Sequence, residues 1–363
     1  MIINMERKNT QLDFSGQAIY VGIDLHSKQW KITTATRELM HKSFSQPANS
    51  LTLYKYLKRT YPRGTYYTVY EAGCFGFWAH RELERYGIHS VVVNPADVPV
   101  TDKEKKPKED KRDSRKLAKA LRGGELEAIH IPMRETEEDR NLMRVRTMFS
   151  KDLTRYKNRI KSMFLYYGIA IPERFSESST HWSRNFMDWV YSVKLHEESG
   201  NTALTKIIEH CEYIRKELLA INREIRKLSR TQRYKEDYTN LISIPGIGTI
   251  TSMVLLTELE DVSRFKNLDR LASYVGLVPR TNSSGEQDKT GSITTRRNNH
   301  IRSLLIESAW IAARTDPALS LKFNELCKRM KRNKAIVIIA KKLLNRVRFV
   351  LLNKQPYVQG IVK

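Results

Sequence analysis

The sequence predicts an N-terminal α/β domain followed by an all-α region, and three observations carry this prediction. Short β-type runs alternate with amphipathic helices through the first third of the chain. Two long stretches with apolar residues at helical spacing come next, and apolar helices around a glycine-rich turn close the chain. With 363 residues, 40% of them hydrophobic, the chain has room for two or three domains with cores of their own.

The first domain is expected over residues 16–130 and opens with three strands. Residues 18–25 form an apolar run typical of a buried strand, and 30–36 and 39–44 follow at hairpin distance. Ser50 then begins an amphipathic helix. The remaining expected elements are strands over 66–70 and 90–93 and helices over 78–86 and 114–121. This order of strands and helices is the ribonuclease-H-like (RuvC-like) one.

Four acidic residues stand out in this domain: Asp24, Glu71, Asp110 and Asp113. The first two lie at the ends of strands that are neighbours in the predicted sheet, and the last two are spaced to share one face of a helix. Each acid alone is more simply a solvated surface residue. Together, four carboxylates repel one another unless cations are bound, and Mg²⁺ prefers oxygen ligands. We therefore expect a divalent metal site able to stabilise the attacking and leaving oxygens of a phosphodiester.

A basic coiled-coil arm is expected over residues 135–236, with a helical cap over 171–200 between its two helices. Arginines and lysines surround an apolar seam on the first helix, and apolar residues recur three and four positions apart on the second. The expected seam residues are Leu142, Val145, Phe149, Tyr156, Ile160, Met163 and Tyr167, then Leu204, Ile207, Cys211, Ile214, Leu218, Ile221, Ile225 and Leu228.

The C-terminal region, residues 237–363, begins with Ile-Pro-Gly-Ile-Gly-Thr at 244–249. This segment is either a helix-hairpin-helix signature or an ordinary glycine-rich turn between helices. In the first case Gly246 and Gly248 let the backbone approach a phosphate, which the N–H groups at the start of the next helix hold without reading sequence.

Residues 276–297 predict a polar loop with Ser284 as a candidate nucleophile. By composition alone a loop serine beside glycine is more often a turn residue. Activation would require a base, a metal or dense positive charge from another part of the protein. Candidate phosphate clamps, chosen because they are near in sequence, are Arg280, Arg296 and Arg297.

The net charge of the chain indicates which class of partner it binds. Sixty-four Lys and Arg against 40 Asp and Glu give a net charge of +24, which is typical of a protein that binds a polyanion such as nucleic acid. Because no apolar run reaches about 18 residues, we expect no membrane partner. Three widely separated cysteines argue against a disulfide framework and a zinc ribbon. The N-terminus shows no secretory pattern, and we expect a cytoplasmic location.

Together these motifs resemble the insertion-sequence transposases that have a DEDD acidic quartet and a catalytic serine, the bridge-RNA-guided recombinases related to the pilin-gene invertases. Their order and spacing carry the resemblance, which covers nearly the whole chain. The matching residues are Tyr20-Val-Gly-Ile-Asp24, Glu71-Ala-Gly, Asn94-Pro95, Asp110-x-x-Asp113-x-x-x-Leu117-Ala118, Ile244-Pro-Gly-Ile-Gly248, Gly276-Leu-x-Pro-Arg280 and Ser284-Gly285.

The resemblance implies that the acidic quartet, with Mg²⁺ or Mn²⁺, and Ser284 act on one phosphodiester through a phosphoserine link to DNA. It implies donor and target DNA, a guide RNA and a homo-oligomer, dimer or tetramer, at the nucleoid of a bacterium or archaeon. The chain departs from the family at Ser114, where alanine is common, and at Ser283, which leaves open whether Ser283 can replace Ser284.

Two other interpretations share these features. A metal-dependent DNA junction nuclease would use the same acids with water as nucleophile and form no covalent product. A non-catalytic nucleic-acid scaffold would use the glycine turn and the basic helices for binding alone.

Overall fold

The computed structural model describes residues 12–99, 110–284 and 287–360. The chain divides into two compact units, residues 1–131 and residues 132–363, which are described separately below. Within the described ranges no helix is both long enough and apolar enough to cross a membrane.

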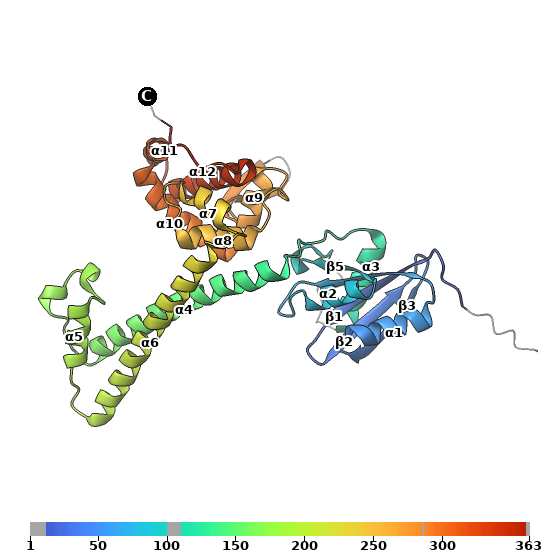
Figure 1. Ribbon diagram of the computed structural model, residues 1–363, viewed down its shortest axis with the longest axis horizontal. Helices are drawn as coiled ribbons and strands as arrows, with labels where there is room; N and C mark the ends of the chain where they lie inside the picture. The colour runs from blue at the N-terminus through green and yellow to red at the C-terminus, as the bar shows by residue number, and fades with distance from the viewer. Residues whose placement is uncertain (1–11, 100–109, 285–286, 361–363) are drawn as a thin grey trace, which may run out of the picture. The chain divides into compact units, whose positions relative to one another are not determined.

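Unit 1 is built on a five-stranded mixed sheet (Figure 1), which confirms the predicted α/β class. The strands lie in the order β3-β2-β1-β4-β5. Antiparallel pairing joins β1 to β2 and β2 to β3, and parallel pairing joins β1 to β4 and β4 to β5. The bounds are β1 (Ala18–Leu25), β2 (Gln29–Ala35), β3 (Met40–Pro47), β4 (Thr65–Glu71) and β5 (His89–Val93).

Helices cover both faces of this sheet. Ile19, Val21 and Ile23 of β1 are buried against α1 (Ser50–Thr60) and α2 (Trp78–Arg85) on one face. On the other face, Leu117 of α3 (Asp110–Gly123) packs with valines of β4 and β5. A short 3-10 helix, η1 (Pro95–Asp97), follows β5. Since side chains alternate along a strand, the residues of β1 that face α3 are the polar or small ones, Gly22 and Asp24 among them.

Unit 2 begins with two long helices, α4 (Arg134–Tyr166) and α6 (Glu198–Leu228), that lie side by side in Figure 1. They run antiparallel, because Arg146 donates to Asn222, while the ring of Tyr156, further along α4, lies 5.1 Å from the ring of His210, which comes earlier in α6. Two 3-10 turns, η3 (Glu173–Phe175) and η4 (Ser178–Thr180), and helix α5 (Arg184–Ser192) connect them and pack against their distal ends.

The seam of α4 differs in phase from the heptad expected from the sequence. Val145 is 37% exposed, whereas Met143 and Phe164 are buried; Tyr167, which is 50% exposed, follows the last residue of α4. An α-helix drifts about 20° per heptad, so a strict seven-residue pattern extended over 33 residues leaves the contact face. On α6 the expected residues Leu204, Cys211 and Ile225 are buried, as is Ile208.

The rest of unit 2 is a helical bundle with one β-hairpin. Its core includes nearly all of α8 and also Met143 of α4 and Ile225 of α6, so the bases of the long helices belong to this bundle. The polar loop expected over 276–297 is wrong in part, because residues 279–284 and 287–293 form paired strands. The elements are α7 (Lys235–Ile242), α8 (Thr249–Leu259), α9 (Leu268–Val275), β6 (Pro279–Ser284), β7 (Gln287–Ile293), α10 (Asn299–Thr315), α11 (Pro317–Cys327) and α12 (Arg332–Asn353).

Candidate functional site

Two of the predicted acids meet at one edge of the sheet in unit 1. The parallel register of β1 and β4 pairs Ile23 with Tyr70, so the next residues, Asp24 and Glu71, lie side by side. Both are half-buried. Alternation along the strands puts Asp24 on the same face as Gly22, and Glu71 on the same face as Val69, which is the face that α3 covers.

Gly22 lets α3 cross β1 at contact distance. A Cβ atom added at Gly22 would lie 2.0 Å from the carbonyl oxygen of Ser114 and 2.5 Å from the backbone nitrogen of Ala118. The buried Ser114 side chain is also fixed, since its Oγ lies 2.9 Å from the hydroxyl of Thr33. The first turn of α3, which carries Asp110 and Asp113, therefore ends one residue before a backbone contact with β1.

The structure describes these four acids to different extents. Asp113 is half-buried, and the Asp24 side chain is 21% exposed with its Oδ2 3.0 Å from Nε2 of His26. Asp110 is the first residue of α3, but its side chain lies outside the described part. Among the residues whose side chains are described, no three His, Cys, Asp or Glu form a group able to hold a metal ion. The sequence did not single out His26, although its position two residues after Asp24 on the same strand edge is a signal.

The oxygen-only chemistry of these acids fits Mg²⁺ better than a transition metal. Asp24, Glu71, Asp110 and Asp113 are the residues that would hold such an ion. Gly22 supports this fit, because any side chain there would push away the helix that carries two of the four carboxylates.

The glycine turn of unit 2 needs its first glycine for packing. Gly246 has φ +88°, and a Cβ there would lie 2.4 Å from the carbonyl oxygen of Ser308 in α10. Gly248 is exposed, with open space around the position of a Cβ, and it precedes α8 without a side-chain cap. The turn therefore packs on one side and leaves the start of α8 accessible on the other, which is an arrangement suited to a phosphate.

Ser284 is placed at the tip of the β6–β7 hairpin. The last pair of the hairpin joins Ser284 to Gln287, so Ser284 is the residue that enters the turn. The side chains of Ser283 and Ser284 lie outside the described part. At the opposite end, Gly276 closes α9 with φ +85°, and a Cβ there would lie 2.4 Å from Cβ of Arg297.

The three predicted arginine clamps lie at the base of this hairpin, away from its tip. Arg280 follows the pair Pro279–Ile293 and donates from Nη2 to Oγ1 of Thr295 at 2.6 Å. It stands four residues before Ser284, about 13 Å along an extended strand. Arg296 and Arg297 are exposed in the segment after β7, and Arg297 donates to Asn299. Nearness in sequence therefore does not bring these arginines to Ser284 within one hairpin.

A buried charge network that the sequence analysis missed supports the hairpin base. Glu258 of α8 is 2% exposed, and both its carboxylate oxygens accept hydrogen bonds from Arg144 of α4, at 2.9 and 3.2 Å. Nδ2 of Asn298, the cap of α10, donates to the same carboxylate at 2.9 Å. Burial alone would raise the pKa of Glu258, but the Arg144 hydrogen bonds and charge, with Asn298 and Arg140, hold the pKa below its ordinary value.

This network connects α4 of the arm to the base of the hairpin, because Arg144 and Asn298 bind the same carboxylate. Asn298 adjoins Arg297, and its backbone N–H donates to the carbonyl oxygen of Tyr274 at 3.1 Å. Burial lowers the pKa of His300, with Glu258 opposing and Arg144 and Lys151 adding to the shift, so this histidine borders the same network. The sequence gives no signal for this network, because no local pattern shows that Arg144 and Glu258, more than a hundred positions apart, form an ion pair.

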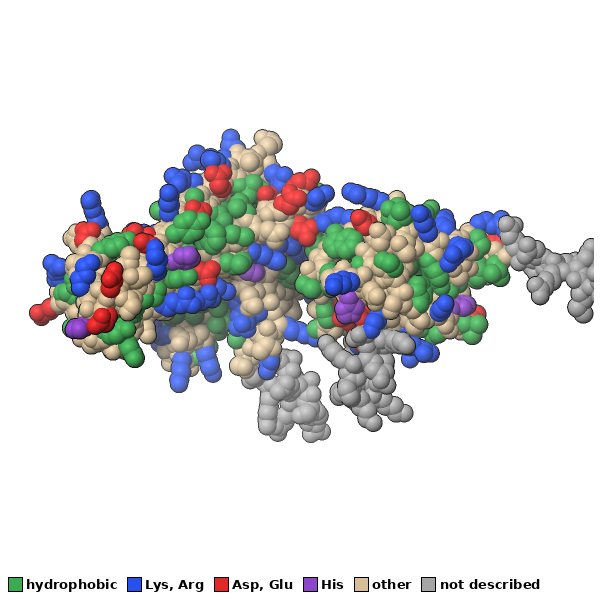
Figure 2. Space-filling model, turned by 90° about the horizontal axis from the view of Figure 1, so that it is seen from below, with side chains coloured by type: hydrophobic (Ala, Val, Ile, Leu, Met, Phe, Trp, Pro, Cys, Tyr) green, Lys and Arg blue, Asp and Glu red, His purple; other side chains and the backbone are tan. Residues whose placement is uncertain are grey.

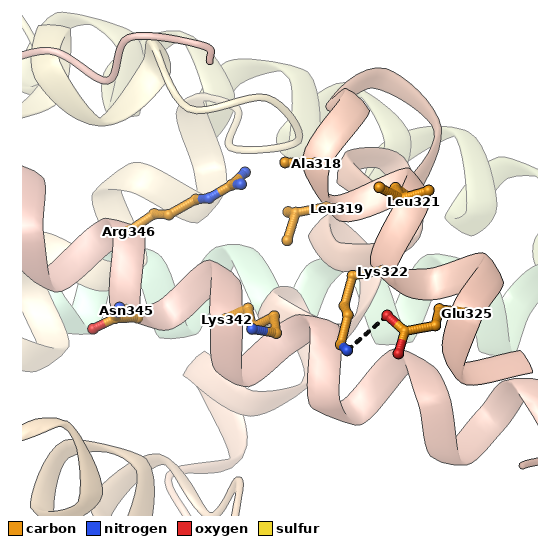
Figure 3. Close-up of a pocket in the computed structure, with 8 residues that line it drawn as sticks. All are labelled: Ala318, Leu319, Leu321, Lys322, Glu325, Lys342, Asn345 and Arg346. Carbon is orange, nitrogen blue, oxygen red and sulfur yellow. Dashed lines mark hydrogen bonds and ion pairs between the residues drawn. The ribbon is translucent and has the colours of Figure 1, made fainter. Parts of the chain in front are cut away.

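Basic side chains are scattered over the face seen in Figure 2, with acidic ones between them. A hollow of about 390 Å³ lies between α11 and α12 and is lined by Lys322, Lys342 and Arg346 among others (Figure 3). Lys322 pairs with Glu325 at 2.7 Å, and Arg346 pairs with the buried Asp316. These two basic groups are therefore already neutralised within the chain.

Comparison with known proteins shows that the chain is similar to transposases. Residues 238–324 match the model of the transposase IS116/IS110/IS902 family, and residues 21–168 match a transposase model named for the DEDD enzymes of IS110. A Sinorhizobium fredii protein named as a transposase is 30% identical over 359 residues, which cover 90% of each chain. The chain belongs to the IS116/IS110/IS902 family of transposases.

Other members of the family match over shorter spans. A second Sinorhizobium fredii transposase is 29% identical over 67% of this chain, and the match spans 58% of that relative's length. The transposase for insertion sequence element IS1111A of Coxiella burnetii is 26% identical over 72% of this chain and 71% of its own. Transposases are DNA recombination enzymes, so the family makes DNA the substrate class of this transposase. The segment 21–168 contains the sheet edge with Asp24 and Glu71, which we call the acidic edge. The segment 238–324 contains the glycine turn and the β6–β7 hairpin with Ser284 at its tip, which we call the serine hairpin.

Proposed function

We propose that this transposase cleaves and rejoins DNA through a phosphoserine intermediate, with the acidic quartet and Ser284 acting on the same phosphodiester. The observation that supports it most is the acidic edge, where Asp24 and Glu71 lie side by side under a helix that begins with Asp110 and Asp113. A Mg²⁺ or Mn²⁺ ion held by these carboxylates would supply positive charge for the phosphoryl oxygens and would lower the barrier to ionising a hydroxyl.

The serine then needs no histidine partner. Ser284 Oγ loses its proton as it forms a bond to phosphorus, and the bond from phosphorus to the departing sugar oxygen breaks, with that oxygen taking up a proton. The hydroxyl of a partner DNA end later attacks the phosphoserine, which re-forms the serine hydroxyl and the DNA backbone. Its position at a hairpin tip supports this role, because a tip can reach a substrate that another unit holds.

The acidic edge and the serine hairpin belong to different units of the chain. We propose that a homo-oligomer, a dimer or tetramer on DNA, brings an edge from one copy to a hairpin of another, with α4 and α6 as the arm that helps the copies assemble. A guide RNA would choose donor and target sequences by base pairing, and the basic surface would hold its backbone. The exposed Gly248 turn and Arg280, Arg296 and Arg297 would contact DNA phosphates without reading sequence.

A suicide DNA substrate that releases one strand after cleavage tests this function. Wild-type protein with Mg²⁺ and the RNA that copurifies with it is expected to give a protein–DNA adduct that survives denaturation. Ser284→Ala should abolish the adduct, whereas Ser283→Ala, the matched neighbour, should retain it.

The result also separates the two rival functions. If the wild type nicks DNA in Mg²⁺ but forms no adduct, the recombinase function is rejected and a junction nuclease that uses water as nucleophile is supported. If Asp24→Ala, Asp113→Ala and Ser284→Ala leave every activity unchanged, the protein is a non-catalytic nucleic-acid scaffold.

A further inference from the structure

Three basic side chains near the distal end of the arm gather around one tryptophan. Nζ of Lys157 and Nζ of Lys161, both on α4, lie 5.2 and 5.9 Å from the ring centroid of Trp182. Arg215 of α6 donates from Nη1 to the carbonyl oxygen of Trp182 at 3.3 Å. We call Lys157, Lys161, Arg215 and Trp182 the arm cation cluster.

The cluster holds like charges together without an acidic partner. Within the described ranges, none of its three cations forms an ion pair with a carboxylate, although Lys157 and Lys161 are half-buried. Other lysines of the same arm are paired, such as Lys206 with Glu209 at 2.9 Å and Lys227 with Glu224 at 2.8 Å. Partly buried charges are ordinarily paired, so the missing anion is the unusual feature of this site.

The electrostatics of Lys157 agree with this description. Burial lowers the pKa of its ammonium, the neighbouring charges of Arg215 and Lys161 lower it further, and the thiol of Cys211 acts in the opposite direction. An anion bound among the three cations would remove the repulsion and favour the charged form of the lysine.

Local structure fixes the cluster in place. Trp182 has φ +68°, a left-handed conformation that is rare for a bulky side chain and is often found at ligand sites. Its ring packs against the buried Phe186 with the centroids 5.3 Å apart. Lys161 donates to Nδ1 of His181 at 2.7 Å, and Nε2 of the same histidine donates to the carbonyl oxygen of Phe175 at 2.8 Å. The lysine is thus oriented by a neutral group that adds no negative charge.

We propose that the arm cation cluster binds consecutive phosphates of a nucleic-acid backbone. The planar fork of Arg215 and the point charges of the two lysines are the groups that bind phosphate in proteins. RNA and DNA present the same phosphodiester, and the test below distinguishes them. The site uses neither Asp24 nor Ser284, so its failure would leave the proposed function intact, and loss of catalysis would leave this site intact.

The test compares the full-length Lys157→Gln/Lys161→Gln variant with the wild type and with Lys206→Gln as the matched control. Binding is measured by fluorescence anisotropy to single-stranded RNA, single-stranded DNA and duplex DNA of one sequence, over a range of salt concentrations. Each phosphate contact contributes about 0.7–0.9 to the slope of log K against log salt, so the double variant should lose up to about 1.4–1.8. Lys206→Gln should keep the wild-type slope, because Glu209 already neutralises that lysine.

The polymer whose slope falls is the occupant of the site, and an unchanged slope with all three polymers overturns the proposal. Glutamine keeps a hydrogen-bond donor at each position, and the lost contacts with the Trp182 ring are offset by the removal of two repelling charges, so a folded double variant is expected, which its melting temperature checks. A second measurement needs no variant: lysine acylation of the wild type with and without each polymer, read by mass spectrometry. Lys157 and Lys161 should be protected while Lys206 is not, and equal labelling with and without all polymers would also overturn the proposal.

Discussion

Replacing Gly22 with alanine tests whether the packing of α3 on β1 sets up the acidic edge. The new Cβ would lie 2.0 Å from the carbonyl oxygen of Ser114, whereas ordinary contact begins at 3.4 Å. Both clashing atoms, the oxygen of Ser114 and the nitrogen of Ala118, belong to backbone and cannot rotate away. The helix must therefore move outward by about 1 Å, or the strand must bend, if the protein is to fold at all.

The cost follows from this overlap. Overpacking of this kind destabilises a protein by about 1–3 kcal/mol, which corresponds to a loss of about 4–12 °C in melting temperature for a unit of this size. A shift of about 1 Å in catalytic carboxylates reduces turnover about a hundredfold. Calorimetry of the full chain measures the first effect, and amide hydrogen exchange in residues 114–121 measures loosening of α3.

A control in the same unit is available at Gly73, where an added Cβ meets nothing within 4 Å, so Gly73→Ala should leave the melting temperature within about 1 °C. If Gly22→Ala melts with the wild type, keeps slow exchange in α3 and forms adduct at the normal rate, the packing argument is wrong.

The remaining predictions concern unit 2. Glu258→Gln should destabilise the chain by about 1–3 kcal/mol near neutral pH, since it leaves Arg144 without its buried partner. The pKa of Glu258 is lowered in the folded state, so its contribution is present above the ordinary value of 4.5 and is lost as pH falls through the lowered pKa. Chemical denaturation at several pH values should show the variant and wild type converging in acid; a constant difference would disprove the linkage. Gly246→Ala should cost about 1–3 kcal/mol because of its positive φ and its contact with Ser308, and Gly248→Ala only a few tenths. Equal melting temperatures for these two variants would contradict the packing of the turn.

The acidic edge could be predicted from sequence because it depends on local patterns. An apolar strand with Asp24 next to its last residue and a second strand that ends in Glu71 are visible as runs, and the order of elements makes the two strands neighbours. The spacing of Asp110 and Asp113 on a helix is likewise local. The contact that brings α3 to β1 is not, since a single glycine among apolar residues does not reveal which backbone approaches it.

Sequence reasoning failed where tertiary contacts override local composition. Residues 276–297 are polar and rich in Ser and Thr, which predicts a loop, yet residues 279–284 pair with 287–293, and Arg302 donates to the carbonyl oxygens of Gly276 and Thr294 at the base of this hairpin. The network around Glu258 joins residues from α4, α8 and the N-cap of α10, and no periodicity marks it. The predicted seam of α4 is out of phase, with Met143 and Phe164 buried and Val145 exposed, because the buried face follows helix geometry more closely than a heptad.

The most direct test of the central claim is mass-spectrometric mapping of the trapped protein–DNA adduct, in wild type and in Asp24→Asn. If the acidic edge and the serine hairpin act on one phosphodiester, the DNA remnant is attached to Ser284, and Asp24→Asn folds but forms no adduct. Attachment to any other residue, or full adduct yield in Asp24→Asn, would contradict the account.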